Sequence, residues 1–140
     1  MFKIRILTIG KTKEEWLKAA LEEYTKRLSK SVEIVWILAK NDHELEKISL
    51  DERALITLDP NGEAFSSEQF SAFLMDQLST HGCKLSILIG GAEGIPKSLK
   101  QKSKQISLSK MTFTHQITRL VLLEQIYRAL EITKGSSYHK

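Results

Sequence analysis

Residues 85–96 read LSILIGGAEGIP, and the interpretation of the whole sequence starts from them. The first five of these residues are almost continuously apolar, as expected for a strand that is buried on both faces of a parallel sheet. Gly90, Gly91 and Gly94 follow at the carboxyl end of this strand, where open α/β sheets bind ligands and a flat group can approach the bare backbone. A tight turn is the alternative use of three glycines, with Pro96 starting the next helix.

The length and composition predict a single domain over residues 1–140, because 41% of the residues are hydrophobic and can form a substantial core. The one cysteine, Cys83, has no partner for an internal disulfide and is expected to be a small buried hydrophobe. The four histidines are scattered, so no metal site is expected. No apolar stretch is long enough to span a membrane, and the charged N-terminus is unlike a signal peptide, which predicts a cytoplasmic protein.

Positive charge is concentrated in the second half of the chain. Residues 1–83 carry 11 Lys and Arg against 14 Asp and Glu, a net charge of −3, whereas residues 84–140 carry 10 against 3, a net charge of +7. Because the basic half contains the glycine segment, we expect a polyanionic partner. An ordinary solvated face is the simpler interpretation of the clustered lysines, Lys97, Lys100, Lys102 and Lys104.

Strand and helix patterns alternate about five times along the chain. The first helix is predicted to begin with a capping box of Thr12 and Glu15, and Trp16 and Tyr24 belong to its apolar face. We expect this face to pack on the sheet, and contact with a second subunit is the alternative for the two aromatic residues. Strands are expected over residues 2–9, 32–38, 54–58 and 85–89, with a short one within 105–113.

Turn and cap residues mark further boundaries. The sequence DPNG at residues 59–62 predicts a turn at the end of the third strand, Ser66 with Gln69 predicts another capping box, and Gly135 ends a long C-terminal helix. The segment NDHELEKI predicts a short polar helix. Together the elements predict an α/β fold with a mostly parallel sheet and helices on both faces.

Several familiar sites lack support. The segment GGAEGIPKS fits neither the dinucleotide motif G-x-G-x-x-G nor the nucleotide-hydrolase motif G-x-x-x-x-G-K-[ST]. No G-x-S-x-G nucleophile elbow occurs either. The pattern therefore indicates a glycine-floored ligand site beside a basic surface, without a nucleophile or a metal.

Four segments, LIGGAEG, SLSKMTFTHQITR, LEQIYRALEI and the terminal YHK, occur in this order after an N-terminal ILTIGK and a Trp-containing helix. In this combination they closely resemble the RlmH (YbeA-type) branch of the SPOUT methyltransferases, over nearly the whole chain. The resemblance implies a SPOUT-type homodimer with a C-terminal trefoil knot, which pattern reasoning alone would not predict. It also implies that S-adenosyl-L-methionine serves to methylate N3 of a pseudouridine in helix 69 of 23S rRNA on the assembled ribosome.

The resemblance carries the family's cofactor contacts to three strand ends. Backbone groups there can bind adenine and ribose, and apolar side chains can contact the ring. Core packing remains the alternative for Leu58, Leu108 and Phe113. Thr114 is a departure, because many relatives have proline there. The implied cofactor contacts are Leu58, Gly90, Leu108, Ser109, Lys110, Met111, Thr112 and Phe113.

The same resemblance implies His115, Arg119, Tyr138 and His139 as catalytic residues. The sulfonium makes the methyl group electrophilic, so the enzyme has to hold the nitrogen in line and assist loss of the imide proton. A helix cap is the alternative role for His115, and a phosphate or carboxylate partner is the alternative for Arg119.

The tail, residues 136–140, is expected to be mobile in the free protein and to close over the target base, with a frayed terminus as the alternative.

A second function hypothesis is a non-enzymatic RNA- or ribosome-binding module that has kept the fold. The intact GGAEG and SKMTF segments argue against this module, since an RNA binder needs no cofactor floor.

Overall fold

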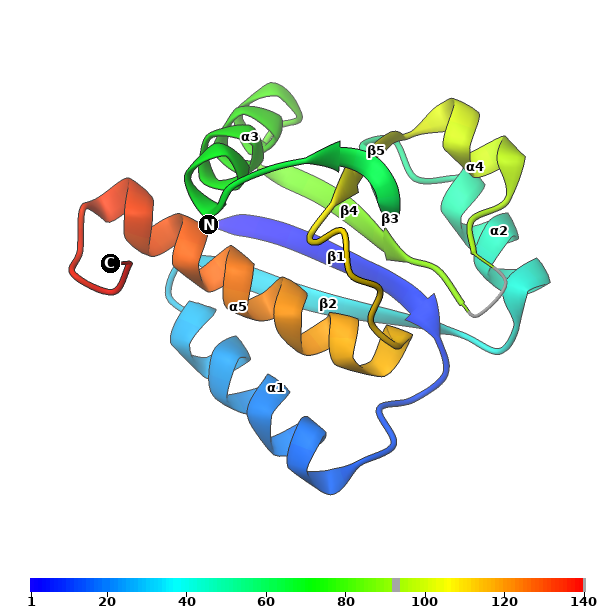
Figure 1. Cartoon of the computed structure of the whole chain (residues 1–140), viewed down its shortest axis with the longest axis horizontal. Helices are drawn as coiled ribbons and strands as arrows, with labels where there is room; N and C mark the ends of the chain where they lie inside the picture. The colour runs from blue at the N-terminus through cyan, green and yellow to red at the C-terminus, as the bar shows by residue number, and fades with distance from the viewer. Residues whose placement is uncertain (92–93, 140) are drawn as a thin grey trace.

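The computed structural model describes residues 1–91 and 94–139. Its five strands form one sheet in the order β2-β1-β4-β3-β5, and every pair of neighbouring strands is parallel (Figure 1). The glycine-flanked strand β4 lies in the middle, as predicted. The strands are β1 (Phe2–Ile9), β2 (Val32–Ala39), β3 (Leu55–Ala64), β4 (Lys84–Ile89) and β5 (Lys104–Ser107).

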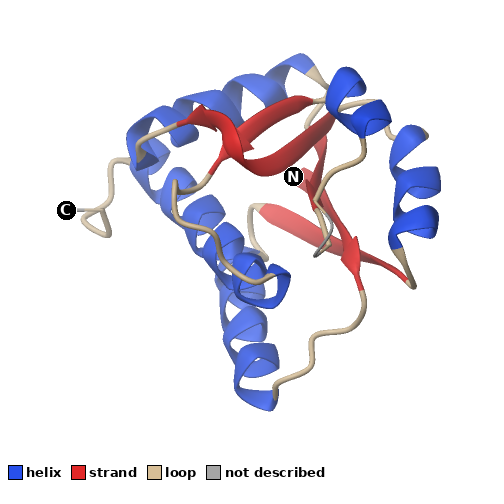
Figure 2. Cartoon of the chain, turned by 45° about the vertical axis from the view of Figure 1, so that its right-hand side comes forward, coloured by secondary structure: helices blue, strands red, loops and turns tan. Residues whose placement is uncertain are grey.

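Helices cover both faces of the sheet, which confirms the predicted architecture (Figures 1 and 2). Three helices pack on one face and two shorter helices on the other, and each set shares a separate buried cluster with the sheet. The first set is α1 (Glu15–Leu28), α3 (Ser67–Thr80) and α5 (His115–Lys134); the second is α2 (Asp42–Leu50) and α4 (Lys97–Lys102). None of the helices in the described parts of the chain is long and apolar enough to cross a membrane.

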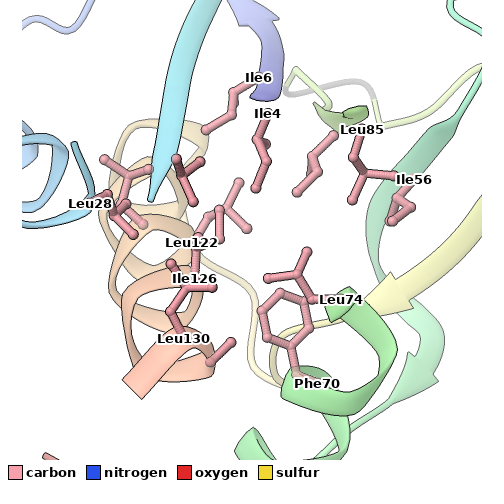
Figure 3. Close-up of a cluster of buried hydrophobic side chains, with 14 of the residues drawn as sticks. Ile4, Ile6, Leu28, Ile56, Phe70, Leu74, Leu85, Leu122, Ile126 and Leu130 are labelled. Atoms are coloured by element: carbon pink, nitrogen blue, oxygen red, sulfur yellow. The ribbon is translucent and has the colours of Figure 1, made fainter. Parts of the chain in front are cut away.

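The larger cluster is built around α5 (Figure 3). Leu122, Ile126 and Leu130 recur every fourth residue and therefore share the helix face that contacts the sheet and α3. Ile4 and Ile6 of β1 point to this cluster, whereas Leu7 points to the cluster beneath α2 and α4. Burial on both faces explains why the central strands carry few polar side chains.

Several predicted boundaries are confirmed. Ser66 and Gln69 form the predicted capping box of α3, and Gly135 ends α5 in the left-handed region at φ 72°. The segment NDHELEKI forms α2, whose N-cap Asn41 accepts a hydrogen bond from the backbone N–H of Glu44 at 2.9 Å.

The predicted start of the first helix is wrong. The N-cap of α1 is Glu14, without a side-chain cap, because the hydroxyl of Thr12 instead accepts a hydrogen bond from Arg119 at 3.0 Å. Trp16 is also not in the core: its exposed fraction is 57%, while Leu17 and Leu21 carry the buried face. Tyr24 lies partly buried, edge-on against Tyr127 of α5.

The third strand does not end at DPNG. Leu58 and Glu63 both pair with Ile106 of β5, so residues 59–62 form a bulge and β3 continues to Ala64. The turn residues still form a local hydrogen bond within the bulge, in which the backbone N–H of Asn61 donates to Asp59 Oδ1 at 2.9 Å. A Cβ on Gly62 would lie 2.8 Å from the Gln105 carbonyl carbon, so only glycine lets the two strands approach here.

Cys83 is exposed, in contrast to the predicted buried hydrophobe. Gly82 and Cys83 both adopt φ 67° and reverse the chain between α3 and β4, which leaves the thiol at the surface.

Candidate active site

A cavity of about 570 Å³ lies at the carboxyl ends of β3 and β4, the edge predicted from the glycine segment. Its wall is formed mainly by the start of the β3 bulge, the loop after β4 and the loop between β5 and α5, with Lys100 of α4 and the first turn of α5 at its border. All but one of the cofactor contacts implied by the resemblance lie in its wall. The wall includes Leu58, Gly90, Leu108, Ser109, Met111, Thr112 and Phe113; Lys110 is exposed and does not line the cavity.

The side chains of the wall are mostly apolar or small. Met111 and Phe113 project at its edge with exposed fractions of 75% and 42%, so the core-packing alternative does not hold for Phe113. The loop that carries them is shaped by two hydrogen bonds: Ser107 Oγ donates to the Ser109 carbonyl at 2.7 Å, and the Met111 N–H donates to Ser109 Oγ at 3.0 Å. The exposed side chains of Met111 and Phe113 can therefore contact a flat apolar face of a ligand.

A side chain at Gly90 or Gly91 would require neighbouring side chains to move. A Cβ on Gly90 would lie 2.5 Å from Ile95 Cδ1 and 3.2 Å from the Gly94 carbonyl oxygen, and a Cβ on Gly91 would lie 2.7 Å from Ile9 Cδ1. Ile95 or Ile9 would have to move to admit a side chain at these positions, so the surroundings favour glycine there. A nucleoside-sized group fits such a cradle.

His115 is the first residue of α5 and lies in the cavity wall. Thr114 caps the helix, since its hydroxyl accepts from the Ile117 N–H at 3.2 Å, so His115 itself is not the cap. Burial, followed by the positive charges of Arg119 and Lys13, lowers the pKa of His115. The imidazole is therefore neutral at neutral pH, and its Nδ1 is buried without a hydrogen-bond partner in the described structure.

Arg119 lies one turn further along α5 and is completely buried. Its Nη2 donates to the carbonyl oxygens of Ile9 and Gly10, both at 2.8 Å, and its Nη1 donates to Thr12. Burial lowers the pKa of the guanidinium. The side chain meets no carboxylate among the described residues, and the contacts that it makes are structural; a direct catalytic contact of Arg119 stays a prediction. Its geometry is that of a positioning residue.

Gln116, which the sequence reasoning did not single out, fixes the same loop. Its Nε2 donates to the Lys11 carbonyl at 3.0 Å, and its Oε1 accepts from the Lys13 N–H at 3.1 Å. Together with Arg119 it attaches the β1–α1 loop, residues 10–14, to the start of α5. No spacing rule signals such a role, because the partners are more than 100 residues apart in sequence.

Tyr138 and His139 belong to the tail that follows α5, near the C-terminus marked in Figure 1. The Tyr138 hydroxyl donates to Glu124 at 2.7 Å, and the ring lies edge-on to Tyr127 and under the Arg128 guanidinium. Burial, and next the contact with Glu124, raise the pKa of Tyr138, so the phenol stays protonated. The prediction of a mobile tail is therefore wrong for Tyr138, which packs against α5.

His139 bridges two elements through its ring nitrogens: Nδ1 lies 3.0 Å from Arg128 Nη1, and Nε2 lies 2.7 Å from a Glu68 carboxylate oxygen. The last tail residue, Lys140, lies outside the described residues. The tail folds back along α5, and its contacts Glu124 and Arg128 lie nine and thirteen residues after His115, about 14 and 20 Å along the helix axis at 1.5 Å per residue. The four candidate catalytic residues therefore do not meet within one chain.

No cluster of three or more potential metal ligands occurs within residues 1–91 and 94–139. In a comparison with family models, residues 2–139 match the family described as "Predicted SPOUT methyltransferase". The chain belongs to the SPOUT methyltransferase family. Members of this family generally use S-adenosylmethionine, and the glycine floor and apolar wall fit such a nucleoside.

Relatives of this SPOUT methyltransferase share one name. The ribosomal RNA large subunit methyltransferase H of Protochlamydia amoebophila (strain UWE25) is 52% identical over 140 residues, which cover both chains completely. The protein of the same name from Prochlorococcus marinus (strain NATL2A) is 40% identical over 141 residues, covering 97% of this chain and 94% of its own. These matches confirm the predicted family.

A solved structure of a probable methylase family protein from Haemophilus influenzae Rd KW20 superposes with a TM-score of 0.57 at 9% identity. The match covers 98% of this chain and 70% of the other, and it supports the SPOUT methyltransferase fold alone.

Proposed function

We propose that this chain is an S-adenosyl-L-methionine-dependent rRNA methyltransferase that modifies N3 of a pseudouridine in helix 69 of 23S rRNA, on assembled ribosomes in the cytoplasm. The observation that carries the proposal is the cavity at the carboxyl ends of β3 and β4, where three distant segments meet around a glycine floor. The names of the two full-length relatives support the rRNA substrate. A non-enzymatic binding module would have no use for this cavity.

The bound cofactor would supply a methyl group made electrophilic by its sulfonium. We assign the apolar contact surface to Leu58, Met111 and Phe113, and the close backbone approach to Gly90. Leu108, Ser109 and Thr112 complete the wall of the same cavity, and we assign Lys110 a contact through its backbone, since it lies in the same loop between two lining residues. Catalysis then depends mainly on holding the nitrogen in line with the methyl group.

His115 is our candidate for the imide proton. It lies in the cavity wall, and its lowered pKa keeps a lone pair available near neutral pH. The role needs no general acid, because the leaving thioether is already a neutral, stable group.

The surface beside His115 suits RNA. The β1–α1 loop presents the exposed side chains of Lys11 and Lys13, and Trp16 follows in the first turn of α1. Basic groups bind phosphates, and exposed aromatic rings stack on unpaired bases. The bonds from Gln116 and Arg119 hold this loop in one position relative to His115.

We further propose a two-fold homodimer in which the tail of one subunit completes the site of the other. Tyr138 and His139 pack against Glu124 and Arg128 of their own α5 and do not line their own chain's cavity, so we assign them to catalysis at a partner's cavity. Antiparallel α5 helices would bring each tail toward the opposite His115. In that arrangement Tyr138 can stack on the base and His139 can donate to a base carbonyl.

Membership of the family also leads us to propose the C-terminal trefoil knot. It would involve the loops around the cavity and α5, since these follow one another in the last third of the chain. A crystal structure traced through residues 84–140 tests it, and an unthreaded path for α5 would overturn it.

The decisive experiment supplies purified protein with radiolabelled S-adenosylmethionine and ribosomes that lack the modification. Label in 23S rRNA is expected, together with a reverse-transcription stop in helix 69, because N3 lies on the base-pairing edge. Calorimetric titration with the cofactor alone tests the binding step. RNA binding without cofactor binding would support the non-enzymatic module instead.

A further inference from the structure

The cavity wall contains one carboxylate and one ammonium group among its described residues, and the two face each other. Asp59 follows Leu58 at the start of the β3 bulge, and Lys100 lies on α4. Lys100 Nζ lies 3.5 Å from Asp59 Oδ2. The other described lining residues are apolar, glycine or uncharged polar, apart from His115. Among the lining residues that the structure describes, formal charge is therefore confined to this pair.

The surroundings of the pair fix its position and leave it open to a ligand. Asp59 Oδ1 accepts the backbone N–H of Asn61 at 2.9 Å, which orients the carboxylate, and the side chain is only 13% exposed. The 3.5 Å separation exceeds the roughly 2.7–2.9 Å of a well-formed charge-assisted hydrogen bond. A carboxylate oxygen and most of the three ammonium donors therefore remain available.

A pair of opposite charges selects a particular kind of ligand. A cation alone would leave the lysine charge in the wall uncompensated, and an anion alone would do the same to the aspartate. A ligand with an ammonium and a carboxylate on one carbon compensates both, without a change in net charge.

We infer that Asp59 and Lys100 bind the amino-acid end of the cofactor, with the Asp59 carboxylate accepting from the α-ammonium and Lys100 Nζ donating to the α-carboxylate. The inference rests on the proposed function and adds a recognition step that the resemblance does not assign. It explains why a charged pair lies in a wall that otherwise suits the apolar faces of a nucleoside.

A comparison of two ligands distinguishes binding of the amino-acid end from binding of the adenosine. S-adenosylhomocysteine carries the amino-acid end, whereas 5′-methylthioadenosine has the same adenosine and thioether without it. We expect Asp59→Asn and Lys100→Met each to weaken calorimetric binding of S-adenosylhomocysteine by at least roughly tenfold. Binding of 5′-methylthioadenosine should stay within about twofold of wild type, which also shows that the variant cavity is folded.

The matched control is the Glu63–Lys104 pair, which also joins β3 to a neighbouring element but lies outside the cavity wall. Glu63→Gln and Lys104→Met should leave both affinities unchanged. Equal losses for both ligands in Asp59→Asn would overturn the inference and indicate recognition of the ribose. Unchanged affinities in both cavity variants would show that the pair only joins β3 to α4. If wild-type protein binds neither nucleoside, the proposed function fails and the inference fails with it.

Discussion

Gly90 shows how a single hydrogen atom in place of a side chain shapes the site. In Gly90→Val, the new side chain would displace Ile95 and the Gly94 carbonyl, both of which belong to the loop that floors the cavity. We expect the variant to lose S-adenosylmethionine binding and to remain folded, because residue 90 lies beyond the buried end of β4. Calorimetry measures the first effect and a circular-dichroism melt the second. Wild-type affinity in this variant would remove the loop from the site.

The electrostatics of His115 lead to a pH prediction. Because its pKa is lowered from the usual 6.5, the protonated form that cannot act as a base accumulates only below that pH. The rate of methyl transfer at saturating substrate should therefore fall on the acid side below pH 6.5. Lys13→Met removes a nearby positive charge, which raises the pKa of His115 and moves the acid limb to higher pH.

Lys18→Met is the matched control for this effect, since Lys18 pairs with Glu15 and is not among the causes of the His115 shift. Its pH profile should coincide with that of wild type. An acid limb that is the same in all three proteins would exclude His115 as the titrating group.

The place of individual residues was predictable where they follow a strand. Leu58, Gly90, Leu108, Ser109 and residues 111–113 line one cavity, as positions after parallel strands allow, and their contact with the cofactor stays a prediction. Roles that depend on a distant partner were not predictable. Arg119 carries a full charge, yet its acceptors are backbone carbonyls of β1 and the following loop, and no sequence pattern identifies a carbonyl as a partner.

At the scale of elements, the start of α5 and the β1–α1 loop behave as one unit. Arg119→Lys keeps the charge, but a lysine cannot reach three acceptors in the planar arrangement of a guanidinium. Because buried carbonyls would lose their donors, we expect about 1–3 kcal/mol of destabilisation, measured by urea unfolding.

The comparison for this prediction is Arg27→Lys, which alters an exposed pair with Glu23 and a stack on Tyr24 and should lower stability much less than Arg119→Lys. If Arg119→Lys were as stable as wild type but inactive, Arg119 would be a substrate contact and the positioning role would be wrong.

The tail is the second element with a testable role. Deleting residues 136–140 removes Tyr138 and His139, neither of which lines the cavity, so cofactor affinity should stay unchanged. Methyl transfer to ribosomes should fall by at least roughly 10²-fold, the loss expected for a positioned catalytic group. His139→Ala alone should give part of this loss. Full activity without the tail would make its packing against Glu124 and Arg128 merely structural.

The elements themselves were largely predictable, because apolar periodicity and capping residues are local signals. All five strands and the helices follow the predicted order. The helix α3 begins at the expected capping box, and α5 ends at the expected glycine. Both wrong boundaries have a cause in the tertiary structure. The strand β3 continues beyond DPNG because Glu63 pairs again with β5. Thr12 does not cap α1 because its hydroxyl accepts a hydrogen bond from Arg119 of α5.

For the whole molecule, the proposed dimer predicts complementation. A tail-less subunit retains His115, and a His115→Ala subunit retains its tail, so a mixed dimer contains one complete site. After the two inactive proteins are unfolded and refolded together, activity should return well above that of either alone. Activity that stays absent, with mixed dimers demonstrated by mass spectrometry, would exclude a site shared between subunits.

Charge asymmetry gives the last prediction at this scale. The +7 of residues 84–140 should make ribosome binding weaken steeply with salt, whereas cofactor binding in the cavity should change little. Filter binding at several salt concentrations measures the slope, and a flat response would contradict a phosphate-contacting surface.

The bulge of β3 allows the number of residues in this strand to vary without a change in its register with β5. Leu58 and Glu63 pair with the same residue of β5, so residues between them can be added or removed without shifting any other pair in the sheet. A single insertion within β4 would instead turn every following side chain to the opposite face. The cavity wall near Asp59 can thus be redesigned, by evolution or by grafting longer loops, while the hydrophobic core keeps its inherited arrangement.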